Sequence, residues 1–262
     1  MRNIVLSSGS IMLLFSLALN AGENHPRYSK NRLQADVDSI MQSAVNNDRI
    51  PGAVVLIKEN GKVICRKAYG YAQKYDISRH LIDHPDRMKT SQIFDIASLT
   101  KVIGTTTSVM LLADRGLIKV DDPVGKYIAA FSKGDKKDIT IRHLLTHTAG
   151  LYEWYPMYYR AGTKEECFRL IGELPLKYKV GEQRKYSDLG FTVLGQIIEA
   201  VSGQSLDDFV KDNIFTALGM NNTTYCPLKT FKAERIAVTS PGNPYEYRMV
   251  RDSTLGFTIK EI

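Results

Sequence analysis

Apolar residues recur at helix spacing in the first patterned stretch of the chain. Between residues 32 and 47 they are Leu33, Val37, Ile40, Met41, Ala44 and Val45. Residues three and four positions apart share one face of a helix, so this spacing predicts an amphipathic helix. The segment "IPG" at residues 50–52 then ends it.

Two β-type runs follow in "AVVLIKENGKVICRKAYGYA", residues 53–72. The dipeptide Asn60-Gly61 between them is the strongest short sequence signal for a tight hairpin. We therefore expect an antiparallel hairpin with the first helix packed on it. Residues 73–92 are polar, contain two histidines, and predict a long loop.

Helix-type patterns dominate the next part of the chain. Residues 98–115 predict a buried helix that ends at Gly116 and has Val102, Val109, Met110 and Leu112 inside. Thr140 is a plausible N-cap for a short helix, and residues 191–203 and 205–219 predict two more helices, each ending at a glycine. A helix and hairpin followed mostly by helices favour an α+β fold over alternating parallel units.

The first 21 residues differ from the rest. Arg2 is their only charge, and an apolar run ends in small residues at Ala21. This order predicts a cleaved secretory signal peptide at 1–21, followed by one domain at 22–262, and hence a secreted or periplasmic protein. The alternative is an uncleaved N-terminal membrane anchor, because about 20 uncharged residues can span a bilayer.

Composition narrows the function classes. Apolar residues make up 44% of the 262 residues and charged residues 24%, which is ordinary for a globular protein, and the net charge is +7. The basic residues are scattered, which argues against nucleic-acid binding but is compatible with an anionic cell wall or membrane nearby. Cys65, Cys167 and Cys226 are too widely spaced for a metal site or a dense disulfide framework. We predict no metal and no cofactor.

The segment "FDIASLTKVIG", residues 94–104, places Ser98 and Lys101 three positions apart. On a helix this puts both side chains on one face, about 5–6 Å apart at Cβ. A serine hydroxyl needs a base to become a nucleophile, and a buried lysine with a lowered pKa can accept its proton. The alternative is a helix-capping serine with a solvated lysine, but the apolar flanks favour partial burial of Lys101.

A second motif, "KYSDLGF" at residues 185–191, precedes a predicted helix. A buried Tyr186 beside a cationic lysine could act as a general base. The alternative for this motif alone is a packed aromatic Tyr186 and an N-cap at Asp188.

Together these motifs resemble the serine β-lactamase and penicillin-binding-protein superfamily. The resemblance is to the branch of class C β-lactamases, D-alanyl-D-alanine carboxypeptidases and related esterases. It is carried by four stretches in family order, residues 93–128, 139–151, 185–210 and 214–220. Ser-x-x-Lys belongs to the motif set of these enzymes. The resemblance implies an α+β β-lactamase/transpeptidase-like fold, with a helical domain packed on an antiparallel sheet.

The resemblance also implies roles for individual residues. Ser98 matches the acylated nucleophile, Lys101 the lysine that shares its proton, and Tyr186 the general base of this branch. Asp188 lies at a substrate-binding position where the family more often has asparagine. His147, in "HTAGL", matches a signature with a structural role. An ionised Asp188 can only accept hydrogen bonds, and it would favour the charged form of Lys101, which shifts proton transfer to Tyr186 and argues against efficient antibiotic hydrolysis.

A third family element, Lys or His followed by any residue and Gly, is not found in residues 187–262; "LKTF" at 228–231 comes closest. We therefore expect a chain truncated at the C-terminus, with an incomplete sheet and weak activity. The expected function is acyl-enzyme hydrolysis of a small molecule or peptidoglycan peptide, of the carboxypeptidase or esterase type. The alternatives are a non-catalytic penicillin- or peptidoglycan-binding protein and a β-lactamase. The oligomeric state stays open.

Overall fold

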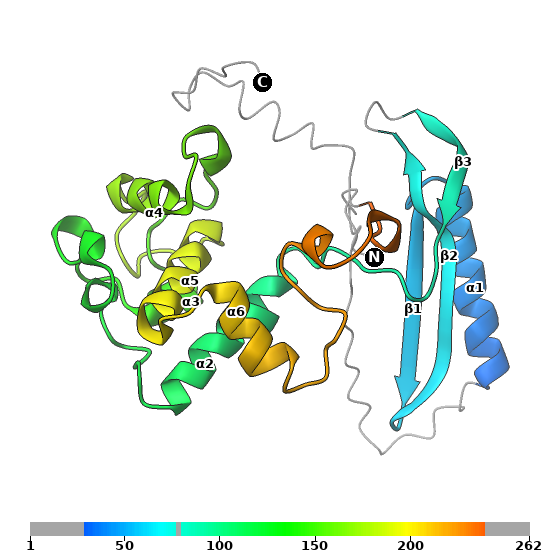
Figure 1. The fold of residues 1–262 in the computed structure, drawn as a ribbon, viewed down its shortest axis with the longest axis horizontal. Coiled ribbons are helices and arrows are strands. Elements are labelled where there is room, and N and C mark those ends of the chain that lie inside the picture. Colours follow the sequence, from blue (N-terminus) through cyan, green and yellow to red (C-terminus); the bar gives the residue numbers. More distant parts are fainter. Residues whose placement is uncertain (1–28, 77–79, 239–262) are drawn as a thin grey trace. The chain divides into compact units, whose positions relative to one another are not determined.

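A computed structural model describes residues 29–76 and 80–238 of the chain. These residues form two compact units, one from 29–96 with 226–238 and one from 97–225 (Figure 1). The predicted signal peptide at 1–21 lies outside the described residues. No helix in the described ranges is both long enough and apolar enough to span a membrane.

The first unit is a helix on a three-stranded antiparallel sheet (Figure 1). Its elements are α1 (Lys30–Asn46), β1 (Gly52–Glu59), β2 (Lys62–Tyr75), β3 (Leu81–Arg87) and the 3-10 turns η7 (Pro227–Lys229) and η8 (Ala233–Arg235). The strand order is β1-β2-β3. Asn60 and Gly61 both have positive φ, as a tight type I′ hairpin turn requires. The predicted hairpin is confirmed.

Helix α1 is fixed to the sheet by polar contacts beside its apolar stripe. Val45 is buried, Lys67 Nζ forms an ion pair with Asp38 at 2.8 Å, and the Tyr69 hydroxyl donates to Asp38 at 2.6 Å. Ile40, which we placed on the buried face, is 67% exposed. The prediction is wrong there because Asp38, with its two partners on β2, occupies the sheet-facing side.

The predicted loop at 73–92 contains a strand. Strand β2 continues to Tyr75, and β3 pairs with it through Tyr71↔Arg87 and Tyr75↔Leu81. This edge strand has mostly exposed polar side chains and a proline at 85, and besides the backbone pairing its Arg87 guanidinium lies 4.8 Å from the centre of the Tyr71 ring on β2. Such a strand lacks the apolar alternation on which the sequence prediction depended.

The second unit is helical and carries the larger core. Its helices are the π-helix η1 (Lys101–Thr106), α2 (Thr107–Asp114), α3 (Ile141–Leu145), α4 (Lys164–Glu173), α5 (Asp188–Ser202), α6 (Leu206–Val210) and the π-helix η6 (Lys211–Phe215). Four 3-10 turns join them, η2 (Val124–Lys126), η3 (Ala129–Phe131), η4 (Gly134–Lys136) and η5 (Met157–Tyr159). Leu112, Phe131, Leu194 and Phe209 are among the fully buried side chains. The α+β fold class is confirmed.

The helix after Ser98 begins as a π-helix and continues as α2. Val109 and Leu112 are buried as predicted, but Val102 and Met110 are 61% and 64% exposed. A π-helix has a wider turn than an α-helix, so it rotates the residues on either side out of a common 3.6-residue register. At Gly104 an added Cβ would lie 2.6 Å from the Tyr225 hydroxyl, so this turn admits only glycine without a shift.

Candidate active site

Ser98 lies directly before the helix, at an exposed turn. Ala97 has a φ of 45°, an uncommon value for a residue other than glycine. Lys101 N–H donates to the Ser98 carbonyl at 3.1 Å, and Lys101 Nζ donates to Ser98 Oγ at 3.3 Å. The three-residue spacing therefore brings the hydroxyl and the amine into contact, with the hydroxyl open to solvent.

Lys101 is largely enclosed and paired with Asp188. Its side chain is 17% exposed, and its Nζ lies 2.7 Å from Asp188 Oδ1. This ion pair is the only polar contact of that buried oxygen within the described residues. Burial acts to lower the pKa of Lys101, but hydrogen bonding and charge from Asp188 and Tyr186 outweigh it, and the pKa is raised. The expected net lowering of the Lys101 pKa is therefore wrong, whereas the effect predicted for a carboxylate at 188, a pKa shifted toward the charged amine, is present.

Tyr186 lies in the same cluster. Lys101 Nζ is 5.1 Å from the centre of the Tyr186 ring, and Tyr186 is 50% exposed rather than buried. The structure thus brings together all four residues selected from the sequence, Ser98, Lys101, Tyr186 and Asp188. Their chemical roles stay predictions.

The turn at residues 185–190 positions Tyr186 and Asp188. Ser187, not Asp188, is the N-cap of α5, since Ser187 Oγ accepts from Gly190 N–H at 3.1 Å. The same hydroxyl donates to the Tyr152 carbonyl at 2.6 Å, and Asp188 N–H donates to the Glu153 carbonyl at 2.7 Å. Asp188 therefore does not cap the helix, and its carboxylate pairs with Lys101.

Two aromatic side chains complete the cluster. The His147 ring lies 4.6 Å from the Tyr186 ring and 5.1 Å from Phe191, measured between centroids. Phe191 also lies 5.9 Å from Lys101 Nζ. Phe191 was not predicted as a site residue, although its position in α5, three residues after Asp188, places it on the same side of the helix.

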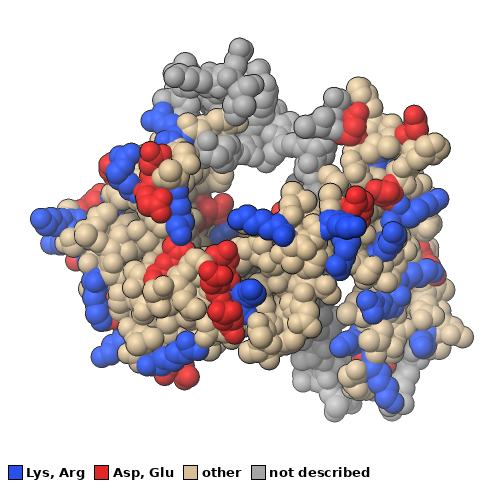
Figure 2. All heavy atoms as spheres, in the orientation of Figure 1, with Lys and Arg blue, Asp and Glu red and all other residues tan. Residues whose placement is uncertain are grey.

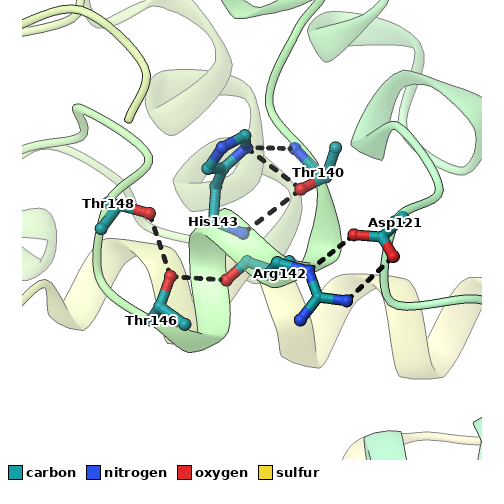
Figure 3. A network of polar contacts seen from close by, with 6 residues as sticks. All are labelled: Asp121, Thr140, Arg142, His143, Thr146 and Thr148. Atoms are coloured by element: carbon teal, nitrogen blue, oxygen red, sulfur yellow. Dashed lines mark hydrogen bonds and ion pairs between the residues drawn. The ribbon is translucent and has the colours of Figure 1, made fainter. Parts of the chain in front are cut away.

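The two histidines of "HLLTH", His143 and His147, make different contacts. His143 Nδ1 accepts from Thr140 N–H at 3.1 Å, which closes a capping box at the start of α3 (Figure 3). Beside it Arg142 makes a two-point contact with Asp121 at 2.6 and 2.9 Å. The N-cap predicted at Thr140 is confirmed, since its side-chain oxygen accepts from His143 N–H at 3.3 Å. The described part of the chain holds no group of three potential metal ligands.

Charge on the visible face is mixed. Figure 2 shows acidic and basic side chains interspersed over the described residues, without one continuous basic stripe on that face. Arg184 and Lys185, next to Tyr186, are exposed.

Known proteins resemble this chain over most of its length. The family profile described as "Beta-lactamase" matches residues 37–248. A putative D-alanyl-D-alanine carboxypeptidase of Escherichia coli (strain K12) is 35% identical over 78% of this chain and 51% of its own length. An N-acetylmuramyl-L-alanine amidase of Bacillus subtilis (strain 168) is 32% identical over 72% of this chain and 46% of its own length. The chain spans about half the length of these curated relatives.

Solved structures give the same fold. EstCE1, a hydrolase with promiscuous acyltransferase activity, superposes with a TM-score of 0.66 at 28% identity, covering 80% of this chain and 56% of that one. A class C β-lactamase superposes with a TM-score of 0.65 at 22% identity, covering 81% of this chain and 56% of that one. At that identity the second likeness supports the fold alone.

Proposed function

Because the chain belongs to the β-lactamase family, we propose that it is a serine hydrolase that forms an acyl-enzyme on Ser98. The observation that carries this proposal is the close approach of the Ser98, Lys101 and Tyr186 side chains. Ser98 Oγ lies 3.3 Å from Lys101 Nζ, which in turn lies 5.1 Å from the Tyr186 ring centre. A nucleophile, a fixed cation and a phenol thus meet at a solvent-exposed point.

Tyr186 carries the proton in both steps of the proposed reaction, acylation and deacylation. In acylation, Ser98 Oγ bonds to the acyl carbon and its proton passes to the oxygen of Tyr186, which acts as the general base. The bond to the leaving group then breaks, and the leaving group takes that proton. In deacylation, a water oxygen attacks the acyl carbon and gives its proton to Tyr186, which returns it to Ser98 Oγ as the ester bond breaks. Lys101, held as a cation by Asp188, places its positive charge 5.1 Å from the centre of the Tyr186 ring.

For the substrate we propose a cell-wall peptide or a related ester. Two relatives are named as a D-alanyl-D-alanine carboxypeptidase and an N-acetylmuramyl-L-alanine amidase, and EstCE1 is described as a hydrolase with acyltransferase activity. Export through residues 1–21 would bring the chain to that substrate. The surplus of basic residues suits an anionic wall.

One observation favours a second candidate, a protein that binds such peptides or penicillins without turnover. The raised pKa of Lys101 keeps the amine charged and unable to accept a proton from Ser98. If Tyr186 does not serve as the base, the hydroxyl has no acceptor.

Labelling of the full chain tests the proposal. We expect a fluorescent penicillin to form a covalent adduct at Ser98, located by peptide mass spectrometry, and we expect slow, saturable hydrolysis of a p-nitrophenyl ester. An adduct without ester turnover identifies the binding protein. Absence of both the adduct and the turnover contradicts the acyl-enzyme proposal.

Asp188→Asn is expected to raise nitrocefin hydrolysis by about tenfold, the effect of one well-placed hydrogen bond of roughly 1.4 kcal/mol. Asparagine can donate a hydrogen bond to a substrate carbonyl, whereas a carboxylate can only accept one. Initial rates of the variant and of the exposed control Asp212→Asn measure this. Fast hydrolysis by the unmodified chain, or an unchanged rate in Asp188→Asn, would contradict it.

A further inference from the structure

We propose that His147 is a positioning residue that clamps Tyr186 into the site and releases it on protonation. The inference rests on the proposed function, because it assigns the clamp to the reaction in which Tyr186 moves the proton.

The clamp has three points of contact. The His147 carbonyl accepts from Lys185 N–H at 2.9 Å, and His147 Nδ1 accepts from Ser187 N–H at 3.0 Å. The two residues on either side of Tyr186 are therefore both bound to one histidine. The ring of the same histidine lies 4.6 Å from the ring of Tyr186 itself. Backbone and side chain of Tyr186 are fixed together.

The clamp itself is anchored at the end of α3. His147 has a φ of 59°, a left-handed conformation, and its N–H donates to the Leu144 carbonyl at 3.2 Å. Thr148 N–H donates to the His143 carbonyl at 2.8 Å, and Gly181 N–H donates to the Thr148 carbonyl at 2.8 Å. Hydrogen bonds of His147 and Thr148 to α3 and to Gly181 thus fix the backbone at residue 147 independently of its contacts with Tyr186.

The Ser187 contact fixes the protonation state of the ring. An Nδ1 that accepts a hydrogen bond carries no proton, so a neutral His147 must hold its proton on Nε2. A doubly protonated ring has two donors and no acceptor. Protonation therefore breaks the bond to Ser187 and leaves one of the two backbone anchors of Tyr186.

The surrounding charges set the pH at which this happens. Lys101 from η1, Arg184 from the segment before Tyr186, and Asp188 from α5 act on the ring, which also contacts Tyr186 and Phe191. Burial first, then Lys101 and Arg184, lower the pKa of His147, while Asp188 opposes them. The ring is therefore neutral at neutral pH, and the clamp is lost as pH falls through a value below the ordinary histidine pKa of about 6.5. The contribution of His147 to stability follows the same sign, complete above the ordinary pKa and lost on acidification.

Two variants separate the parts of the clamp. His147→Asn keeps a hydrogen-bond acceptor and tolerates positive φ, but removes the ring, whereas His147→Phe keeps an aromatic ring without the acceptor. Since a misplacement of about 1 Å can cost about 10²-fold in rate, we expect His147→Phe to lower kcat for the p-nitrophenyl ester by up to about 10²-fold at unchanged KM. His147→Asn should recover at least about tenfold of that loss, because it restores the bond to Ser187.

The pH profile distinguishes positioning from general damage. Below about pH 6.5 the unmodified chain should lose kcat more steeply than His147→Asn does, whereas the control His80→Asn, whose histidine lies in the first unit, should follow the unmodified chain. Acid limbs of equal steepness in His147→Asn and the unmodified chain, or equal losses in the two His147 variants, overturn the proposal.

A measurement that needs no turnover separates failure of the clamp from failure of the proposed function. In Ser98→Ala, ¹⁵N NMR of His147 should show the Nε2–H tautomer, with the Ser187 amide resonance shifting as His147 titrates. The Nδ1–H tautomer, or an unresponsive Ser187 amide, overturns the clamp. A clamp seen by NMR in a chain without Ser98-dependent acylation overturns the proposed function and the catalytic role of His147 with it.

Discussion

We expect Ser98→Ala to remove covalent labelling by a fluorescent penicillin and to lower kcat for the p-nitrophenyl ester by at least about 10⁴-fold, the scale seen when a hydrolase loses its nucleophile. The substitution deletes one oxygen from an exposed turn, so the fold should be unaffected. Lys101 keeps its ion pair with Asp188 at 2.7 Å, and the remaining cluster stays in place. The loss is therefore chemical rather than structural.

Ser132→Ala is the matched control, because Ser132 is an exposed hydroxyl in the same unit that donates to the Ala129 carbonyl at 2.7 Å. Circular dichroism and thermal unfolding compare both variants with the unmodified chain. Labelling that persists in Ser98→Ala at the original rate places the nucleophile elsewhere and contradicts the site.

Local spacing was sufficient for the part of the site that lies within one turn of helix. Ser98 and Lys101 are three residues apart, so helix geometry alone predicts their contact, which the structure shows at 3.3 Å. The hairpin at Asn60-Gly61 follows in the same way from the φ values that those residues favour. These features depend on neighbours in the sequence.

Features that depend on contacts between residues far apart in the sequence could not be predicted from the spacing of apolar residues. Tyr186 is 85 positions from Lys101, and only the family resemblance, not its spacing, linked the two. The strand β3 depends on pairing with β2 rather than on its own polar residues. Val102 is exposed on a π-helix turn, and Gly104 of the same turn lies close to Tyr225, which is far away in the sequence. None of these arises from a repeat of apolar residues.

The motif around His147 can be found in the sequence, but its contacts with residues 185–187 can be seen only in the structure. The sequence marks "HTAGL" and supports a structural role, but the left-handed turn at His147 and the Nδ1 acceptor become visible only when residues 185–187 lie against it. The Asp188 carboxylate is a different case. Its identity alone predicted a charged Lys101, and the raised pKa of that amine agrees.

Tyr186→Phe is expected to lower kcat for the p-nitrophenyl ester by about 10²–10⁴-fold with little change in KM, the range for removal of a general base. Phenylalanine keeps the ring whose centre lies 4.6 Å from that of His147 and 5.1 Å from Lys101 Nζ, so the variant removes only the oxygen proposed to move the proton. Tyr71→Phe on β2, in the first unit, is the control for loss of a tyrosine hydroxyl. Stopped-flow acylation and steady-state rates measure both variants.

Lys101→Arg decides between the two possible proton acceptors. Arginine stays charged and cannot accept a proton, but it can still pair with Asp188. If Lys101 acts only as a cation, as its raised pKa and the ion pair at 2.7 Å indicate, Lys101→Arg retains more activity than Tyr186→Phe. The reverse order, with Lys101→Arg the more damaging change and Tyr186→Phe nearly as active as the unmodified chain, would make the amine the base and remove Tyr186 from the mechanism.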